Sequence, residues 1–373
     1  MSYHGRFEQS NQPKKKKGLK IFLTVFAVLL VIVLIAAGLV YWFIQSKFKK
    51  MDIIELGEDT YAYTDPTDEE TRPAEMVDTQ TETEDVVTET TIPPMTADDI
   101  VNILVVGQAS RAGEEALNAD TTMLVSINTY TKEVTLFSIL RDSFVKLPDY
   151  KGHTCGRSKF TFCYNLGYQW GGGVAGAMEM TNICLRDNFG IEVDYNVEVS
   201  FDGFIKMIDF LDGVDIELTQ AEADYLNKDT LYVKRTIEPG VQRLQGMEAL
   251  SYARMRKAEG DSESDIKRTE RQRRLVSALL EKVRYMSLKE LNEWVDILLP
   301  MVTTTMTPSD VVKLAARVLP LIVDLKISGN TVPMQGWGDI VDIFDDGTQH
   351  SVMKFETATE KKLIRAITEA EIE

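Results

Sequence analysis

The apolar segment from Ile21 to Ile44 constrains this 373-residue chain more than any other feature. It contains no charged residue, is long enough to cross a bilayer, and ends in three aromatic residues of the kind found at membrane interfaces. We interpret it as one transmembrane helix. The basic residues before it predict a cytoplasmic tail over residues 1–20 and an extracytoplasmic C-terminal part. A cleaved signal peptide is the alternative. It is disfavoured because the apolar run is longer than that of a usual signal peptide and no small-x-small cleavage site follows it.

The segment that follows, residues 45–98, is predicted to be an acidic disordered linker. Between Asp52 and Asp99 the chain has 16 acidic residues and a single basic one, so this segment cannot bury a core. The globular part must then lie in residues 99–373. Of the net charge of −17, residues 1–50 contribute +8 and residues 52–99 contribute −15, which leaves about −10 for the rest. An acidic domain of this kind is a poor binder of nucleic acid.

The pattern after residue 99 alternates strands and helices. Ile100–Val106 is a continuous apolar run that predicts a strand buried on both faces. Two further strands are predicted at Met123–Asn128 and Val134–Ile139, joined by a polar turn. This alternation predicts one α/β domain. Later elements are expected at Tyr195–Ser200, Phe201–Leu211, Val214–Leu218, Leu291–Leu299 and Ser309–Val323, and, as strand or irregular chain, at Met334–Phe344.

A cluster of basic residues between Met247 and Arg274 is a local exception in this acidic chain. Cations placed together repel one another unless an anion lies among them, and the guanidinium group matches phosphate or carboxylate oxygens. One interpretation is an anion-binding site, and the other is a solvated face neutralised by the acidic residues between Glu259 and Glu270. The cations are Arg254, Arg256, Lys257, Lys267, Arg268, Arg271, Arg273 and Arg274.

The expected backbone brings the first two arginines of this cluster together. Apolar spacing over Gly246–Ala253 predicts a helix that ends near Arg254. Two residues apart on a helix, Arg254 and Arg256 would point in nearly opposite directions, whereas in an extended segment they share a face. We therefore expect extended chain after Arg254.

A second helix of the cluster is predicted to begin at Ser264 or Asp265. Arg268 and Arg271, with Gln272, then lie on one side of its first turns, where cations oppose the helix dipole and cost stability unless an anion is bound. The exposed side of this helix is expected to carry Arg273 and Arg274. The residues expected to be buried are Leu275, Val276, Leu279, Leu280, Val283 and Met286.

Asp120, Arg141 and Asp142 lie at the ends of predicted strands. In α/β sheets, ligands bind where loops leave the carboxyl edge of the strands, which favours a role in chemistry for these residues. A turn aspartate and a surface arginine are the alternative.

The three cysteines, Cys155, Cys163 and Cys184, lie close together in the sequence. One pair could form a disulfide in an exported domain, but the spacing does not identify the pair and offers no zinc site. Only two histidines, His153 and His350, lie in the domain, so catalysis by histidine has little support.

Seven segments of residues 100–345 carry a further signal through their order: NILVVGQASR from Asn102, NADTTMLVSIN from Asn118, SILRD from Ser138, SKF from Ser158, DGVDIEL from Asp212, LQGMEALSYARMR from Leu244 and DIKRTERQR from Asp265. In this order they resemble the LytR-CpsA-Psr family of cell-envelope phosphotransferases. The resemblance implies a single three-layer α/β/α domain with a central mixed sheet. It also implies transfer of a teichoic-acid-like or capsular glycopolymer from a polyprenyl pyrophosphate carrier to a peptidoglycan hydroxyl, in a Gram-positive-type cell membrane.

The resemblance also implies roles for single residues. Asp120 matches the family's metal-associated aspartate, so Mg²⁺ is the expected cofactor. Asp120, Asp142 and Arg141 are the expected catalytic residues, and few protein ligands suffice for Mg²⁺ when phosphates complete its shell. The residues expected to bind the pyrophosphate are Arg141, Lys159, Arg254, Arg256, Arg268 and Arg271.

The first loop departs from the family's pattern, because Ala109 stands where an aspartate of the Gly-x-Asp-x-Arg motif is usual. The loss of a carboxylate is expected to weaken Mg²⁺ binding unless Glu114 or Glu115 replaces it. This departure keeps a second hypothesis open: a non-catalytic family member that binds lipid pyrophosphates or acidic polymers at the envelope. A membrane-tethered transcription regulator has little support, since the short cytoplasmic tail cannot form a DNA-binding domain.

Overall fold

The computed structural model describes residues 52–57, 95–96, 99–108, 119–256, 258, 264–334, 336–343 and 349–368, and for Asp120, Ser264, Leu288, 336–343 and 349–350 it describes the backbone alone. All of these residues belong to the compact unit Met51–Glu373. The predicted cytoplasmic tail and transmembrane helix, and most of the predicted linker, lie outside the described residues. Within the described part of the chain, no helix has both the length and the apolar character that crossing a membrane requires.

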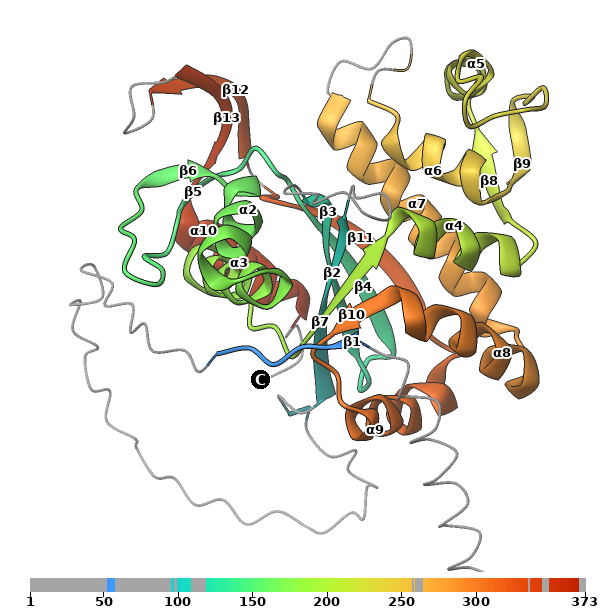
Figure 1. Cartoon of the computed structure of the whole chain (residues 1–373), viewed down its shortest axis with the longest axis horizontal. Helices are drawn as coiled ribbons and strands as arrows, with labels where there is room; N and C mark the ends of the chain where they lie inside the picture. Colours follow the sequence, from blue (N-terminus) through green and yellow to red (C-terminus); the bar gives the residue numbers. More distant parts are fainter. Residues whose placement is uncertain are drawn as a thin grey trace, which may run out of the picture. The chain divides into compact units, whose positions relative to one another are not determined.

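A seven-stranded mixed sheet lies at the centre, in the order β1-β10-β7-β2-β3-β4-β11 (Figure 1). Three pairs are parallel (β1 with β10, β7 with β2, β4 with β11) and three are antiparallel (β10 with β7, β2 with β3, β3 with β4). The prediction of an α/β fold with a central mixed sheet is confirmed. The strands are β1 (Asp52–Ile53), β2 (Ile100–Gln108), β3 (Ala119–Asn128), β4 (Glu133–Ile139), β7 (Tyr195–Ser200), β10 (Val302–Thr304) and β11 (Lys326–Val332).

The central strands are apolar along their length because helices cover both faces of the sheet. In β2, Leu104 and Val106 belong to the core on one face, whereas Val101 and Ile103 pack on the other. This division follows from the period of two along a strand. The continuous apolar run of β2 therefore reflects two cores rather than one.

Helices α2, α3 and α10 cover the first face (Figure 1). Cys163 of α2 and Cys184 of α3 are buried beside each other in this layer, and all three cysteines of the chain are free. Burial raises the pKa of the Cys163 thiol. The elements of this side are α2 (Thr161–Gly171), α3 (Val174–Phe189), α10 (Thr357–Thr368) and the hairpins β5 (Phe144–Lys146) with β6 (Arg157–Lys159) and β12 (Gly336–Ile343) with β13 (Gln349–Phe355).

The second face carries the remaining helices. Helices α7 and α9 pack on the sheet, while β8, β9, α5 and α6 form a further core with α4 and α7. Side chains cap several of these helices, as Thr219 does by accepting a hydrogen bond from Glu222 N. The elements are α4 (Phe201–Phe210), β8 (Val214–Leu218), α5 (Gln220–Lys228), β9 (Gly240–Leu244), α6 (Gly246–Arg254), α7 (Ser264–Arg284), α8 (Leu288–Leu298), η2 (Leu299–Met301), α9 (Pro308–Val318) and η3 (Leu319–Leu321).

Residues 52–57 differ from the expectation of a disordered linker over 45–98. Asp52 and Ile53 form β1, which pairs with β10 at the edge of the sheet, and Ile54 N donates to Thr304 O at 2.9 Å. Ile54 and Leu56 also pack against the core of the first face. The apolar residues of this short stretch are enough to hold it, although the surrounding composition is acidic.

A buried ion pair joins α5 to α7. Arg271 Nε donates to Glu222 Oε1 at 2.9 Å, and Arg274 Nη1 donates to the same oxygen at 3.2 Å. The side chains of Glu222 and Arg271 are only 5% and 4% exposed. Burial alone would raise the pKa of Glu222, but the Thr219 backbone N–H and the two guanidinium groups outweigh burial and lower the pKa below its ordinary 4.5.

Helices α2 and α3 touch backbone to backbone at glycines, which generates a prediction for Gly176→Ala. A Cβ atom at Gly176 would overlap the backbone of Gly171 and come within 2.5 Å of Gly167 O. We expect the variant to lose about 2 kcal/mol in the free energy of unfolding, measured by denaturant titration. At an unconstrained helical site the same change stabilises by roughly 0.5–1 kcal/mol, so a gain in stability would contradict the close contact.

The pKa of Glu222 predicts how stability depends on pH. Because the native pKa lies below the unfolded one, the ionised group stabilises the fold above the unfolded pKa, and this contribution is lost as the pH falls through the native pKa. Glu222→Gln should cost about 3 kcal/mol near pH 7. The difference from the wild type should shrink below pH 4.5. Glu217→Gln, at an exposed position of β8, is the control; a deficit that does not change with pH would argue against the ion pair.

Candidate anion and lipid site

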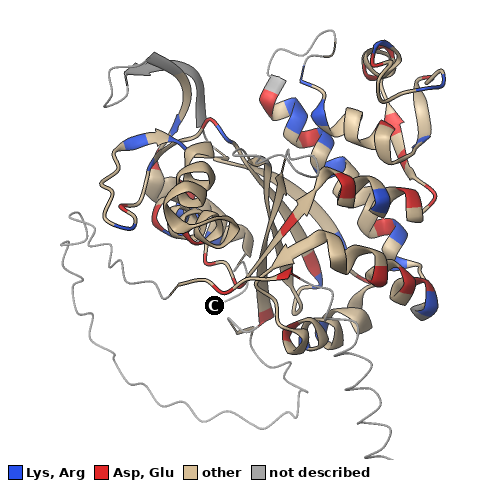
Figure 2. Ribbon diagram, in the orientation of Figure 1, with Lys and Arg blue, Asp and Glu red and all other residues tan. Residues whose placement is uncertain are grey.

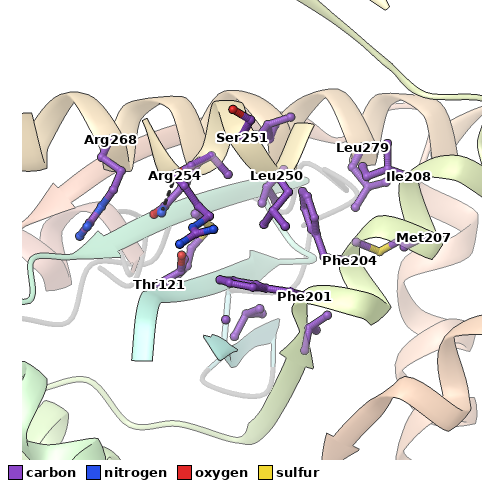
Figure 3. Close-up of a pocket in the computed structure, with 18 of the residues that line it drawn as sticks. Thr121, Phe201, Phe204, Met207, Ile208, Leu250, Ser251, Arg254, Arg268 and Leu279 are labelled. Atoms are coloured by element: carbon purple, nitrogen blue, oxygen red, sulfur yellow. Dashed lines mark hydrogen bonds between the residues drawn. The ribbon is translucent and has the colours of Figure 1, made fainter. Parts of the chain in front are cut away.

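A cavity of about 730 Å³ lies between the sheet and helices α4, α6 and α7 (Figure 3). Strands β2, β3 and β7 contribute Val105, Met123 and Val199 to its wall. The helices contribute a mostly apolar lining, which includes Phe204, Met207, Ile208, Leu250, Leu275, Val276, Leu279 and Leu280.

Helix α7 begins at Ser264, as the sequence predicts. Of the α7 residues expected to be buried, Leu275 is 2% exposed, but Leu279 and Leu280 are only half-buried. All three line the cavity. The apolar face of α7 therefore borders an open space as well as a packed core, and helical periodicity cannot distinguish these two environments.

One end of the cavity is cationic. Figure 3 shows Arg254 and Arg268 together at one end and Met207 and Leu279 at the other. Arg256 also lines the cavity, and both Arg254 and Arg256 are exposed. Helix α6 ends at Arg254 and Met255 between the two arginines is buried, so the predicted extended segment is confirmed.

Aromatic residues hold the Arg254 guanidinium in place. Its centre lies 5.2 Å from the ring centroid of Phe201 and 5.9 Å from that of Tyr232. Its Nη1 also donates to the Tyr232 hydroxyl at 3.2 Å. These contacts orient the cation without neutralising it, so its charge is available to an anionic ligand.

Asp265 connects the cationic end to a second group of charges. Its Oδ1 forms ion pairs with two arginines, 2.7 Å from Arg268 Nη2 and 3.5 Å from Arg141 Nε. Arg268 is buried on the cavity wall, whereas Arg141 belongs to the loop that follows β4. A carboxylate in the first turn of α7 also offsets the unfavourable interaction of these cations with the helix dipole.

The second group consists of Arg141, Asp142 and Lys159. Lys159 Nζ donates to Asp142 Oδ1 at 2.8 Å, and Arg141 Nε lies 3.6 Å from Asp142 Oδ2. Lys159 comes from β6 of the β5–β6 hairpin. Four separate segments of the chain thus meet around one region of alternating charge. They are the loop after β4, strand β6, the end of α6 and the first turns of α7.

The remaining arginines of the cluster lie elsewhere. Arg271, which the resemblance implies as a pyrophosphate contact, is buried in the ion pair with Glu222 and is not part of the cavity wall. Arg273 and Arg274 were expected on the exposed side of α7, and this expectation is wrong. Both are half-buried: Arg273 Nη1 donates to Thr331 Oγ1 at 2.9 Å, and Arg274 pairs with Glu222. The acidic and hydroxyl partners of these cations are remote in sequence, so periodicity alone could not locate them.

Asp120 is the second residue of β3 and directly precedes Thr121, which lines the cavity. The side chain of Asp120 lies outside the described part of the structure, as does the loop that contains Ala109, Glu114 and Glu115. The structure therefore gives the position of the Asp120 backbone only.

Three residues of the site were not singled out as ligands in the sequence. Phe201 begins α4 directly after β7, a strand end of the kind that signals ligand sites. Tyr232 has no comparable signal. Asp265 was expected only as a helix cap or a neutralising charge, yet its Oδ2 is buried and has no hydrogen-bond partner among the described residues. Gln272, named with the arginines, lines the cavity and donates to Ala253 O at 3.2 Å.

The arrangement suits an amphiphilic anion. An apolar volume can take a hydrocarbon chain, and the guanidinium and ammonium groups at its end can neutralise phosphate oxygens. Carboxylates interleaved with these cations keep them close together without a ligand and can take part in metal binding or proton transfer.

Comparisons with known proteins find relatives of this chain in sequence and in structure. Over 194 residues the chain is 31% identical to the polyisoprenyl-teichoic acid–peptidoglycan teichoic acid transferase TagT of Bacillus subtilis, which covers 51% of this chain and 54% of TagT. Over 267 residues it is 24% identical to biofilm regulatory protein A of Streptococcus mutans, covering 70% and 59% of the two chains. The matches thus span little more than half the length of these two relatives.

Solved structures show the same fold. The crystal structure of Bacillus subtilis TagT superimposes with a TM-score of 0.55 at 22% identity, covering 75% of this chain and 95% of the other. TagT with bound octaprenyl pyrophosphate lipid superimposes with a TM-score of 0.52 at 21% identity, covering 74% and 90%. The family model LytR_cpsA_psr matches residues 60–361. Because this match spans most of the chain, the protein belongs to the LytR-CpsA-Psr family.

Proposed function

We propose that this protein transfers a glycopolymer, of the teichoic-acid or capsular type, from a polyprenyl pyrophosphate carrier to a peptidoglycan hydroxyl. The observation that carries the proposal is the apolar cavity that ends in Arg254, Arg256 and Arg268. Relatives named as teichoic acid transferases, and a family structure with bound octaprenyl pyrophosphate, support it.

The two ends of the cavity match the two parts of a polyprenyl pyrophosphate. An isoprenoid chain has no polar group, so it gains free energy by leaving water for the lining of Phe204, Met207 and Leu279. The diphosphate has several negative charges that cannot enter this lining without loss of solvation. It would remain at the cationic end, within reach of Arg254 and Arg256.

The charged residues would then act on the reacting phosphates. Arg254, Arg256 and Arg268 would hold the diphosphate, while Arg141 and Lys159 would stabilise the negative charge that develops during transfer. Such cations contribute most when they are oriented before the substrate arrives, and the contacts of Arg254 and Arg268 provide that orientation.

The proposed reaction is a single phosphoryl transfer. The acceptor hydroxyl oxygen attacks the phosphorus that bears the sugar, and the bond from this phosphorus to the bridging oxygen breaks. Polyprenyl phosphate leaves, and the hydroxyl proton passes to a carboxylate. Asp120, with Asp142, would position the acceptor hydroxyl or the metal. The product is a phosphodiester that joins the polymer to a peptidoglycan sugar, which we take to be the 6-hydroxyl of muramic acid.

Mg²⁺ is part of the proposal. This ion binds one or two carboxylates and completes its shell with phosphate oxygens and water. Asp265 has a buried Oδ2 without a hydrogen-bond partner among the described residues. Arg141 forms ion pairs with both Asp265 and Asp142. Among the described residues no three such side chains gather into a metal site, so we propose that one or two of these carboxylates, with Asp120, would hold the ion. When bound, it would neutralise charge on the non-bridging phosphate oxygens.

The proposed location is a cell membrane of the Gram-positive type. Residues 21–44 would anchor the chain, residues 1–20 would stay in the cytoplasm, and the folded domain would face peptidoglycan outside the membrane. This topology would place the cavity in the compartment that contains both proposed substrates.

The second candidate function is binding without turnover. Ala109 favours it, because this position usually supplies a metal-associated aspartate in the family that the chain resembles. Such a protein would still present Arg254, Arg256 and Arg268 to a lipid pyrophosphate.

Arg254→Ala tests the binding site. With farnesyl pyrophosphate as the probe, we expect the full chain to lose roughly 10–100-fold in affinity, which is the usual effect of losing a hydrogen bond to a charged group. The measurement is isothermal titration calorimetry. Lys267→Ala is the matched control, since Lys267 is exposed beside Arg268 and pairs with Glu270. Equal losses in the two variants would mean that bulk charge alone attracts the probe.

Ala109→Asp separates the two functions. The full chain would be given a lipid-pyrophosphate-linked glycopolymer, peptidoglycan and Mg²⁺, and release of polyprenyl phosphate would be measured. The proposed transferase predicts activity in the wild type and a lower Mg²⁺ requirement in Ala109→Asp, because a carboxylate is restored. A silent wild type together with an active Ala109→Asp variant would overturn the proposal in favour of binding without turnover.

A further inference from the structure

Helices α2 and α3 form a hairpin whose contacts follow one register. A Cβ atom added at Gly171 would lie 2.4 Å from Gly176 Cα. One turn earlier in α2, a Cβ atom at Gly167 would lie 2.8 Å from Met180 Cβ, one turn later in α3. A step of four residues back along α2 thus matches a step of four forward along α3, as in antiparallel helices that touch along one face. Helix α2 begins at Thr161, so the pattern allows one further step.

The next step of this register pairs Cys163 with Cys184. Their side chains are in hydrogen-bond contact and fully buried, and in the structure both are thiols. Asn188 Nδ2 also donates to Cys184 Sγ at 3.5 Å. Helices that touch backbone to backbone bring the Cα atoms of a facing pair close together, as a disulfide requires. The third cysteine, Cys155, belongs to the loop between β5 and β6 and is only half-buried.

The surroundings of the pair do not favour thiolate. Helix α2 has no charged residue along its length (Figure 2). Burial raises the pKa of the Cys163 thiol, and α2 offers no cation that would lower this pKa. A thiol in this state is a poor nucleophile and a poor metal ligand, because both tasks need the thiolate. Covalent pairing, completed before the layer closes, is the chemistry that suits these two residues.

We propose that Cys163 and Cys184 form a structural disulfide that joins the first turn of α2 to α3. The bridge would enclose residues 164–183 in a covalent loop. The inference rests on the proposed location of the folded domain outside the membrane, because disulfides form and persist in oxidising compartments.

The bond forms by exchange with an external disulfide, such as oxidised glutathione or the disulfide of an exported oxidoreductase. One cysteine thiolate attacks a sulfur of the oxidant, which gives a mixed disulfide and releases one thiol. The second cysteine thiolate attacks the protein sulfur of the mixed disulfide, and the other half of the oxidant leaves as a thiol. The two cysteines lose two electrons and two protons, and the oxidant gains both. Because both side chains are fully buried, this exchange takes place during folding.

The bridge would support the charged site. Thr161 N, at the start of α2, donates to Arg141 O at 3.0 Å, and Lys159 lies two residues earlier in the chain. Helix ends open locally at a lower cost than the rest of a domain. A cross-link at Cys163 would fix this end of α2 to α3, so the backbone that positions Arg141 and Lys159 would stay with the core.

A tryptic peptide map tests the bridge directly. The full chain is isolated from the membranes of a host that exports it, and it is denatured in N-ethylmaleimide without reductant. No lysine or arginine separates Cys163 from Cys184, so both belong to the peptide 160–186, whereas Cys155 belongs to the peptide 152–157. We expect peptide 160–186 to be lighter by two hydrogen atoms and free of maleimide. Peptide 152–157 should carry maleimide, and cleavage after Glu179 should leave the two halves of the longer peptide joined.

Thermal unfolding gives a second measurement. In tris(carboxyethyl)phosphine, the unfolding midpoint of the wild type should fall by roughly 5–10 °C, as expected when a covalent loop of this size is opened. Cys184→Ala should not respond to the reductant, and Cys155→Ala, the matched control, should respond as the wild type does. If Cys184→Ala fails to fold, the peptide map and the Cys155→Ala variant decide the outcome.

Other results would overturn the inference. These are maleimide on Cys163 and Cys184, a cross-link between peptides 152–157 and 160–186, or an unfolding midpoint that the reductant does not change. A further arm refolds the reduced full chain in neutral detergent with oxidised glutathione. If the bridge forms there but not in the exporting host, the proposed location is at fault; if it forms in neither, the pairing itself is wrong. A bridged, folded protein that fails to bind farnesyl pyrophosphate would contradict the proposed function and leave the disulfide in place.

Discussion

The carboxylate of Asp265 is the interaction on which the geometry of the site depends. It lies 2.7 Å from Arg268 Nη2 and 3.5 Å from Arg141 Nε, so it joins the first turn of α7 to the loop after β4. Without a negative charge between them, two guanidinium groups in a poorly solvated region would repel each other and separate. The same carboxylate opens a helix whose first turns are otherwise basic, where cations are unfavourable. One side chain thus makes a dense cationic site compatible with folding.

The ion pairs divide the arginines of α7 between two tasks. Arg271 and Arg274 meet Glu222 on the side of α5, and they fix the helix to its neighbours. Arg268 and Gln272 line the cavity. Because a helix repeats every 3.6 residues, a closely spaced basic run must send its members in several directions, and only those on one side can meet a ligand. The density of charge in the sequence therefore overstates the charge available for binding.

Much of the fold followed from local patterns. The strands β2, β3 and β4, the end of α6 at Arg254 and the start of α7 at Ser264 were all predictable, because apolar periodicity and caps act within a few residues. The cavity was not, since Leu279 and Leu280 have the same spacing whether they face a packed core or an open space. The partners of Arg271 and Arg273 were equally hidden, because Glu222 and Thr331 are about fifty or more residues away. Edge strand β1 was not predicted, because the apolar residues that make the core contacts next to it lie among acidic residues in the sequence.

The glycine contact between α2 and α3 also bears on the β5–β6 hairpin. Gly167, Gly171 and Gly176 are in backbone contact in the layer beneath the β5–β6 hairpin, and Val145 of the hairpin is buried in the same layer. The hairpin also carries Lys159, which contacts Asp142 at the charged site. An added methyl group at one of these glycines would therefore disturb the position of Lys159 as well as the packing of the layer itself.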